Sequence, residues 1–287
     1  MNPEDVKTVG VLGCGIMGSG IVEVVAKTGA DVIFVERTDD RLERGQKSIE
    51  KSLGKAVEKG KLEEGERDAV LGRIKGTLNV DDLAGVDLVI EAVTEDLDTK
   101  IELFRRLDEI TNPEVVLASN TSSLPLVQMA TATKRPDKVL GMHFFNPPPV
   151  MKLLELVKSI TTSDETVEFA KAYGETLGKT TVLAKDRAGF IVNLLLTSYL
   201  NAAVKMYEEG FATKEDIDTA IKLGLGHPMG PLELLDLIGI DTMLSVGEVL
   251  YDEFKSPEFA PPPLARRMVQ AGFLGRKTGK GFYDYSK

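Results

Sequence analysis

The chain has 287 residues, 43% hydrophobic and 28% charged, which exceeds one typical domain and suffices to bury a large core. Its formal net charge of −10 at pH 7 argues against a nucleic-acid partner, so local cations and backbone N–H groups must hold any phosphate-bearing ligand. The single cysteine, Cys14, excludes an internal disulfide and a cysteine-rich zinc site, and it suits a reducing compartment.

The first residues, MNPEDVKTVGVLG, do not form a secretory signal, because acids lie near the start and no basic region precedes an apolar one. No apolar run in the sequence reaches the length needed to span a membrane. We therefore expect a cytoplasmic protein with no membrane partner.

Residues 8–36 fit a strand–turn–helix–strand unit of the kind that binds dinucleotides. Thr8–Leu12 and Val32–Val35 are apolar strands, and the segment between them matches G-x-G-x-x-G. Its glycines permit a tight turn, close approach of a pyrophosphate and close helix–strand packing, with the pyrophosphate at the helix N-terminus. The alternative is a glycine turn without a ligand, which this context disfavours. We expect the turn to contact the cofactor through Gly13, Gly15, Ile16, Met17 and Gly18.

Glu36 ends the second strand, about 20 residues after the glycines. A carboxylate there can accept hydrogen bonds from both ribose hydroxyls and repels a 2′-phosphate, which favours NAD over NADP. The adjacent Arg37 weakens this preference, because a guanidinium can pair with that phosphate.

Further strands and helices alternate up to about residue 187. Residues 39–75 are predicted to form two helices, Lys100–Ile110 forms another, and the predicted strands are Val86–Val93, Val115–Ser119, Lys138–Phe144, Val150–Val157 and Thr180–Leu183. This alternation predicts an α/β fold with a Rossmann-type, mostly parallel sheet over residues 1–187.

Residues 188–287 are predicted to form a second, smaller domain that is all-helical. They contain no convincing strand, and Pro261–Pro263 is expected to form a stiff surface turn. The predicted helices are Phe190–Tyr207, Asp216–Leu223, Leu232–Ile238 and Thr242–Tyr251.

Two histidines are candidates for a general base with a pKa near neutrality. His143 ends an apolar strand, and strand ends of this architecture face the cofactor crevice. His227 lies in the turn GLGHPMGP, where a surface or packing role is the better interpretation. Position alone leaves a core histidine open for His143.

Five segments together resemble the 3-hydroxyacyl-CoA dehydrogenase family, along essentially the whole chain and in the same order. They are ASNTSSLP, GMHFFNPPPVMKLLELV, KDRAGFIVNLLL, GHPMGPLELLDLIGID and GRKTGKGFYDY. The resemblance implies reversible hydride transfer between NAD and C3 of a short-chain 3-hydroxyacyl-CoA, such as 3-hydroxybutyryl-CoA. It also implies a homodimer, with further assembly of dimers left open.

The resemblance implies a catalytic set of four residues, in a cleft between the domains: Ser122, His143, Glu155 and Asn193. Glu155 would orient the imidazole and stabilise the imidazolium. A Glu within the apolar run LLELV already requires a buried partner, the alternative being an edge-strand Glu that faces water. Ser122 would contact the substrate oxygen near the nicotinamide, and it can also cap the helix that begins near Leu126.

The resemblance also implies cofactor contacts from Glu95, Lys100, Ser122 and Lys277. Contacts to the substrate and its coenzyme A portion would come from Ser52, Lys59, Ser122 and Asn193. Lys51, Lys55 and Lys59 recur every four residues on one helix face, and a solvated face is the alternative interpretation. No metal-spaced ligand cluster is evident, and we expect no metal.

Three alternatives stay open. One is a dehydrogenase of a free hydroxy acid, such as gulonate, on the same fold. The second is a nucleotide-binding or structural relative that has lost catalysis, against which the intact set of Ser122, His143, Glu155 and Asn193 argues. The third is a component of a larger fatty-acid oxidation assembly.

Overall fold

The protein is described by a computed structural model, which places residues 2–286. The chain divides into two compact units, residues 1–186 and residues 187–287. Each unit has its own hydrophobic core and is described by itself.

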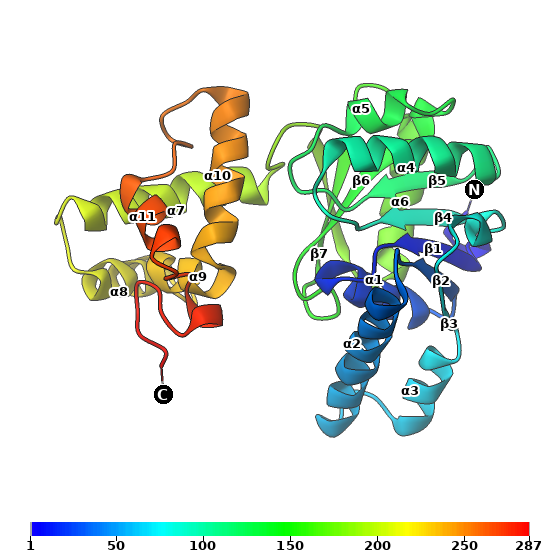
Figure 1. Ribbon diagram of the computed structural model, residues 1–287, viewed down its shortest axis with the longest axis horizontal. Coiled ribbons are helices and arrows are strands. Elements are labelled where there is room, and N and C mark those ends of the chain that lie inside the picture. Colours follow the sequence, from blue (N-terminus) through cyan, green and yellow to red (C-terminus); the bar gives the residue numbers. More distant parts are fainter. Residues whose placement is uncertain (1, 287) are drawn as a thin grey trace. The chain divides into compact units, whose positions relative to one another are not determined.

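The first unit contains one eight-stranded sheet in the order β3-β2-β1-β4-β5-β6-β7-β8 (Figure 1). All neighbouring strands are parallel except β6 and β7, which are antiparallel. The strands are β1 Thr8–Leu12, β2 Asp31–Val35, β3 Ile74–Thr77, β4 Leu88–Glu91, β5 Val116–Ser119, β6 Val139–Phe144, β7 Leu153–Lys158 and β8 Thr180–Lys185. The predicted Rossmann-type, mostly parallel sheet is confirmed.

Helices cover both faces of this sheet. The central strands are therefore buried on both sides, and their sequences are almost entirely apolar. Helices α1 and α6 contribute to one shared core cluster, and α4 and α5 pack together beside β6 (Figure 1). The helices are α1 Ile16–Ala26, α2 Asp39–Glu58, α3 Glu64–Leu71, α4 Leu97–Ile110, α5 Leu126–Thr131 and α6 Asp164–Thr176.

One strand and one α-helix of the first unit were not predicted, nor were its short 3-10 helices Pro3–Asp5, Val80–Leu83 and Pro136–Lys138. Strand β3 has the sequence IKGT, which carries no apolar alternation, and it forms because β2 offers it an edge. Helix α6 begins after Ser163, whose hydroxyl accepts from the backbone N–H of Thr166. Strand β7 begins at Leu153 rather than Val150, because the backbone N–H groups of Val150 and Met151 donate to the Pro147 carbonyl oxygen in a turn.

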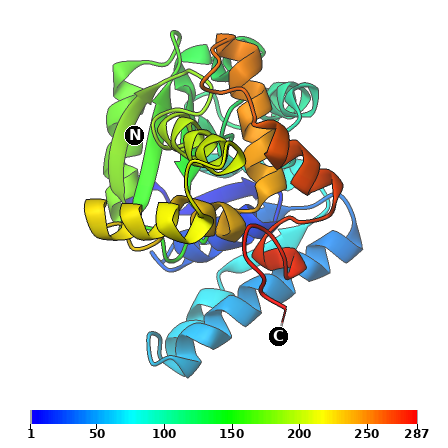
Figure 2. The same ribbon diagram turned by 90° about the vertical axis from the view of Figure 1, so that its left-hand side faces the viewer.

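The second unit is helical, and the isolated bridges of residues 275–284 are the β pairing seen in its described part. Its helices are α7 Val192–Glu208, α8 Lys214–Leu225, α9 Pro231–Ile238, α10 Ile240–Phe254 and α11 Pro263–Gln270, with a short 3-10 helix at Arg276–Thr278. Helices α10 and α11 lie side by side (Figure 2).

The expected surface turn at the prolines is wrong, because Pro261 and Pro262 are buried and Pro263 begins α11. No helix in the described chain is both long and apolar enough to cross a membrane.

Candidate active site

The glycine turn joins β1 to α1, and Gly15 is the one of its three glycines with open space where a Cβ would lie. Gly13 has φ +83°, a backbone conformation that favours glycine. A Cβ at Gly18 would lie 1.9 Å from the Gly13 carbonyl oxygen, so only glycine allows this packing. A Cβ at Gly15 would meet nothing within 4 Å, and Gly15 precedes the first turn of α1. The open backbone and the unbonded N–H groups of that turn fit a pyrophosphate, as predicted for NAD.

Ile16 and Met17 follow in the first turn of α1. The Ile16 side chain is 78% exposed although it is apolar, and Met17 is half-buried at the edge of the core. An apolar side chain exposed beside an open glycine suits a surface that a cofactor covers.

Glu36 lies beside this turn, at the end of β2. Its Oε1 accepts from the backbone N–H of Cys14 at 2.7 Å, and its Oε2 accepts from the N–H of Arg37 at 3.2 Å. The carboxylate is thus anchored to the glycine turn, where the ribose of a dinucleotide is recognised in this fold. The Arg37 side chain is exposed.

His143 and Glu155 form the buried centre of the candidate site. The antiparallel pairing of β6 and β7 places these two residues directly opposite each other. His143 Nδ1 lies 2.7 Å from Glu155 Oε2, and the Phe145 ring packs against the imidazole. Glu155 is fully buried and His143 is 6% exposed, so the predicted interpretation of Glu155 as a buried partner fits the geometry and a water-facing Glu does not.

Ser122 lies in the loop after β5 and is held there by Glu95. Glu95 Oε1 accepts from the Ser122 backbone N–H at 2.9 Å and from Thr121 Oγ1 at 2.6 Å. The expected helix-capping role of Ser122 is wrong. The first N–H groups of α5, from Leu126 and Val127, instead donate to the carboxylate of Asp186.

Lys100, which was predicted to contact the cofactor, is buried in an ion-pair network. Its side chain is 1% exposed, and its ammonium lies 2.6 Å from Glu91 Oε1 and 3.4 Å from Glu95 Oε2. Glu91 was not singled out in the sequence, although its position at the end of the apolar strand VDLVIEAV was a signal. Asn120, also missed, accepts from the backbone N–H of Phe144 through its Oδ1 and ties the loop after β5 to β6.

Ser52 and Lys59 belong to α2 and its C-terminal cap. Ser52 lines a pocket of about 150 Å³ whose walls are formed by the start of α1, by Ser48 and by residues 147–149. Lys51, Lys55 and Lys59 are exposed. Exposed ammonium groups on the helix that carries Ser52 are compatible with binding a phosphate-bearing substrate.

The remaining predicted residues belong to the second unit. Asn193 is half-buried in the first turn of α7. Lys277 is exposed, and its Nζ lies 2.7 Å from Asp241 Oδ2. His227 is exposed with its ring edge-on to Tyr199, which agrees with the predicted surface role.

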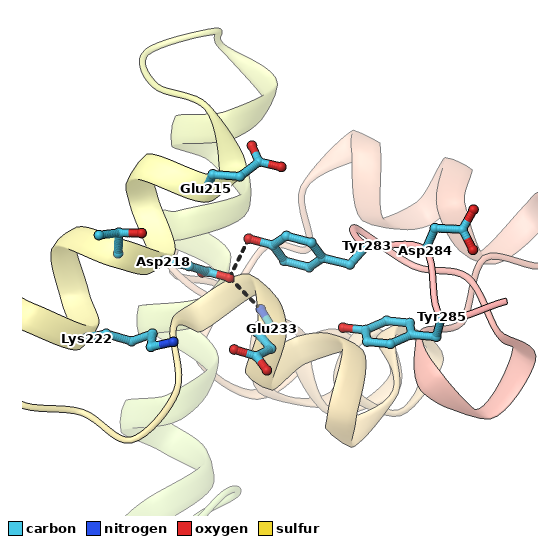
Figure 3. Close-up of a pocket in the computed structure, with 8 residues that line it drawn as sticks. Glu215, Asp218, Lys222, Glu233, Tyr283, Asp284 and Tyr285 are labelled. Atoms are coloured by element: carbon cyan, nitrogen blue, oxygen red, sulfur yellow. Dashed lines mark hydrogen bonds between the residues drawn. The ribbon is translucent and has the colours of Figure 1, made fainter. Parts of the chain in front are cut away.

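A separate pocket in the second unit lies between α8, α9 and the C-terminal segment (Figure 3). Asp218 accepts from the N–H groups of Leu232 and Glu233 and from the Tyr283 hydroxyl. No predicted catalytic or binding residue lines it. These bonds hold helix ends and the C-terminal segment in place, so the pocket is a product of the fold rather than part of the candidate site. Among residues 2–286, no group of His, Cys, Asp and Glu is arranged to hold a metal ion.

The open glycine turn, the anchored Glu36 and the buried histidine–carboxylate pair define a dinucleotide-binding domain with acid–base chemistry at the same sheet. Residues 8–187 match the 3-hydroxyacyl-CoA dehydrogenase NAD binding domain, and residues 189–285 match the C-terminal domain of the same family. The chain belongs to the 3-hydroxyacyl-CoA dehydrogenase family. The prediction of NAD as the cofactor is thereby confirmed.

Similar proteins span nearly the same length as this chain. A 3-hydroxybutyryl-CoA dehydrogenase of Mycobacterium tuberculosis is 49% identical and covers 98% of this chain and 99% of its own. The mitochondrial hydroxyacyl-coenzyme A dehydrogenase of Homo sapiens is 45% identical, with 98% and 91% covered. The crystal structure of (S)-3-hydroxybutyryl-CoA dehydrogenase from Ralstonia eutropha has a TM-score of 0.94 at 45% identity, with 99% and 100% covered.

Proposed function

We propose that this protein interconverts a short-chain (S)-3-hydroxyacyl-CoA and the corresponding 3-oxoacyl-CoA, with 3-hydroxybutyryl-CoA and acetoacetyl-CoA as the type pair. The buried 2.7 Å contact between His143 Nδ1 and Glu155 Oε2 carries this proposal. It supplies an oriented base in a domain of the 3-hydroxyacyl-CoA dehydrogenase family. NAD, when bound, would supply the acceptor for the hydride at C3 of the substrate.

In this proposal His143 handles the proton of the 3-hydroxyl. Because Nδ1 faces Glu155, the neutral imidazole keeps its proton on Nδ1 and accepts the substrate proton at Nε2. The O–H bond breaks towards Nε2 as the C3–H bond breaks, and the ring becomes an imidazolium whose charge Glu155 balances. In the reverse direction the imidazolium protonates the oxygen at C3. Proton transfer of this kind typically contributes about 10²–10⁴-fold to the rate.

The other residues place the substrate. Ser122 donates to the substrate oxygen, and Asn193 helps to polarise it. Ser52 and Lys59 bind the coenzyme A portion, while Glu95, Lys100 and Lys277 serve the cofactor. The position of Ser52 in a pocket beside α1, and the exposed ammonium groups of α2, support the coenzyme A assignment.

The deciding experiment is an absorbance assay of NADH oxidation with acetoacetyl-CoA, compared with NAD reduction by free hydroxy acids, gulonate included. We expect turnover on the thioester and turnover at least about 100-fold lower on the free acids. Turnover on the free acids alone would establish the hydroxy-acid alternative. Binding of NADH without turnover on any of them would establish a relative that has lost catalysis.

We further propose a homodimer in the cytoplasm. The second unit exposes large apolar side chains, among them Leu195, Phe211 and Leu223, which are 68%, 77% and 81% exposed. Such exposure supports an interface with a second copy of the chain. The buried thiol of Cys14 suits a reducing compartment. Light scattering after size-exclusion chromatography tests the dimer, and a monomer at micromolar concentration would contradict it.

A further inference from the structure

A buried ion pair lies under the cofactor edge of the sheet. Glu91 ends β4, in register with Leu12 at the end of β1, just before the glycine turn, and with Ser119 at the end of β5. Its side chain is completely buried. Its Oε1 accepts from Lys100 Nζ at 2.6 Å and from the Val93 N–H at 2.7 Å, and its Oε2 accepts from Ser119 Oγ at 2.6 Å.

Lys100 connects this buried carboxylate to an exposed one. The Lys100 ammonium is 2.6 Å from Glu91 and 3.4 Å from Oε2 of Glu95, whose side chain is 37% exposed. The other oxygen of Glu95, Oε1, accepts from the Ser122 N–H and from Thr121 Oγ1. A continuous chain of charge-assisted contacts therefore runs from Glu91 through Lys100 and Glu95 to the loop that carries Ser122.

We infer that Glu91 is a positioning residue for the cofactor site. It holds the Lys100 ammonium, which holds Glu95 in the orientation that fixes the Ser122 loop and presents a carboxylate to the cofactor. The inference rests on the proposed function in one respect, the assignment of Glu95 and Ser122 to the cofactor and substrate.

The effects of single and double substitutions on stability distinguish this positioning role from a merely structural one. A buried Glu–Lys pair is rarely a net source of stability, because both charges lose their hydration, and an uncharged pair of similar volume usually serves the fold as well. Removal of Lys100 leaves Glu91 as an uncompensated buried charge, and removal of the Glu91 charge leaves the buried ammonium with Glu95 at 3.4 Å as its remaining carboxylate partner, so each change is destabilising. A double substitution to uncharged side chains should therefore restore the fold. It should not restore the hold on Glu95, because Lys100→Met removes the ammonium that contacts Glu95.

The experiment compares Glu91→Gln, Lys100→Met and the double variant of both, using thermal unfolding of the cofactor-free protein and calorimetric titration with NADH. Each single variant should lower the melting temperature by about 10 °C. The double variant should unfold within a few degrees of the wild type. Glu91→Gln, which keeps Lys100, should bind NADH about tenfold more weakly than the wild type, and so should the double variant. If Glu91→Gln fails to fold, Glu91→Asp, which keeps the charge and shortens the side chain, takes its place and should also weaken NADH binding.

Two further variants complete the design. Asp108→Asn breaks another buried ion pair of the same unit, that of Asp108 with Arg135 at 2.9 Å, away from the cofactor edge. It should lower the melting temperature and leave NADH binding within twofold of the wild type. Glu95→Gln should reproduce the weaker NADH binding with little change in melting temperature, because its side chain is partly exposed.

The inference is overturned if Glu91→Gln or the double variant binds NADH within twofold of the wild type, or if Asp108→Asn weakens NADH binding as much as Glu91→Gln does. Neither result depends on acyl-CoA. A wild-type protein that binds NADH and fails to turn over acetoacetyl-CoA would overturn the proposed function alone, and the role of Glu91 in holding the NADH site would stand.

Discussion

Both units bury carboxylates, and they use them differently. In the first unit, Glu155 and Glu91 are fully buried at strand positions and contact ionisable side chains, those of His143 and Lys100. In the second unit, the buried Asp236 and Asp218 accept from backbone N–H groups and tyrosine hydroxyls. The first arrangement fixes a proton or a charge at one edge of the sheet. The second fixes the path of the chain.

The difference teaches how to interpret a buried acid. When its donors are backbone N–H groups at helix starts and turns, the carboxylate replaces missing backbone acceptors and its loss is felt in stability. When its partner is a histidine or lysine beside a ligand-binding turn, its loss is felt in binding or catalysis as well. Substitutions in the two units should therefore separate activity from stability.

The largest effect is expected for His143→Gln. Glutamine can keep a hydrogen bond to Glu155 but cannot take up a proton near neutral pH, so kcat for acetoacetyl-CoA reduction should fall about 10³-fold, or about 4 kcal/mol of transition-state stabilisation. NADH affinity and melting temperature should stay close to wild type. Steady-state kinetics with NADH titration measure both, and a kcat within tenfold of wild type removes His143 from its role.

Asp236→Asn should affect the fold of the second unit instead. Asp236 Oδ1 accepts from the Phe282 N–H, while Oδ2 accepts from the Tyr283 N–H and the Tyr285 hydroxyl. An amide must turn an NH₂ group towards one of these donors, at a cost of about 2–3 kcal/mol or a melting temperature lower by about 5–10 °C. Asp284→Asn, an exposed position of the same segment, is the control and should change it by less than about 1 °C.

The difference in melting temperature between the wild type and Asp236→Asn should also depend on pH. Burial raises the pKa of Asp236, and the three donors offset this only in part. A raised pKa means that the folded state holds the proton more tightly, so this contribution to stability is complete below about pH 4 and is lost as pH rises through the folded-state pKa. The gap in melting temperature between wild type and Asp236→Asn should narrow from pH 4 to pH 7. A widening gap would show that the donors outweigh burial.

The elements that could be predicted from the sequence are those whose pattern lies within a short stretch of the chain. The unit from β1 to β2 was recognised because its strands, glycine turn and acid lie within 30 residues and follow one spacing rule. Strand β3 and helix α6 were missed because their own patterns are weak. The existence of β7 was predicted, but its antiparallel register opposite β6, which brings Glu155 to His143, depends on how the chain returns after Pro147.

Long-range polar contacts were the least predictable part. The capping role given to Ser122 failed because Asp186, sixty residues after Leu126, takes the N–H groups of α5. The role of Asp236 depends on residues 46 and 47 positions later. A side chain's partner follows from packing, and no local pattern encodes it.

Glu36 accepts from the Cys14 N–H, and we propose that it also binds the ribose of the cofactor. Glu36→Ser should raise KM for NAD about tenfold through loss of hydrogen bonds to the ribose, and it should reduce the preference for NAD over NADP. Kinetics with both cofactors measure this. Any gain in NADP use should disappear when Arg37→Ala is added, because that guanidinium is the adjacent cation. An unchanged KM for NAD would limit Glu36 to supporting the glycine turn.

The smallest effect is expected at an exposed cation. Lys100 is buried in an ion-pair network, whereas Lys59 at the end of α2 is exposed, so the coenzyme A phosphate contact that we propose for Lys59 would act through solvent. Lys59→Ala should raise KM for acetoacetyl-CoA about three- to fivefold at low salt with kcat unchanged, and the effect should shrink as salt is added. Lys47→Ala, on the same helix and paired with Glu43, is the matched control. Equal KM values for the two variants would show that Lys59 belongs to a solvated helix face and does not bind coenzyme A.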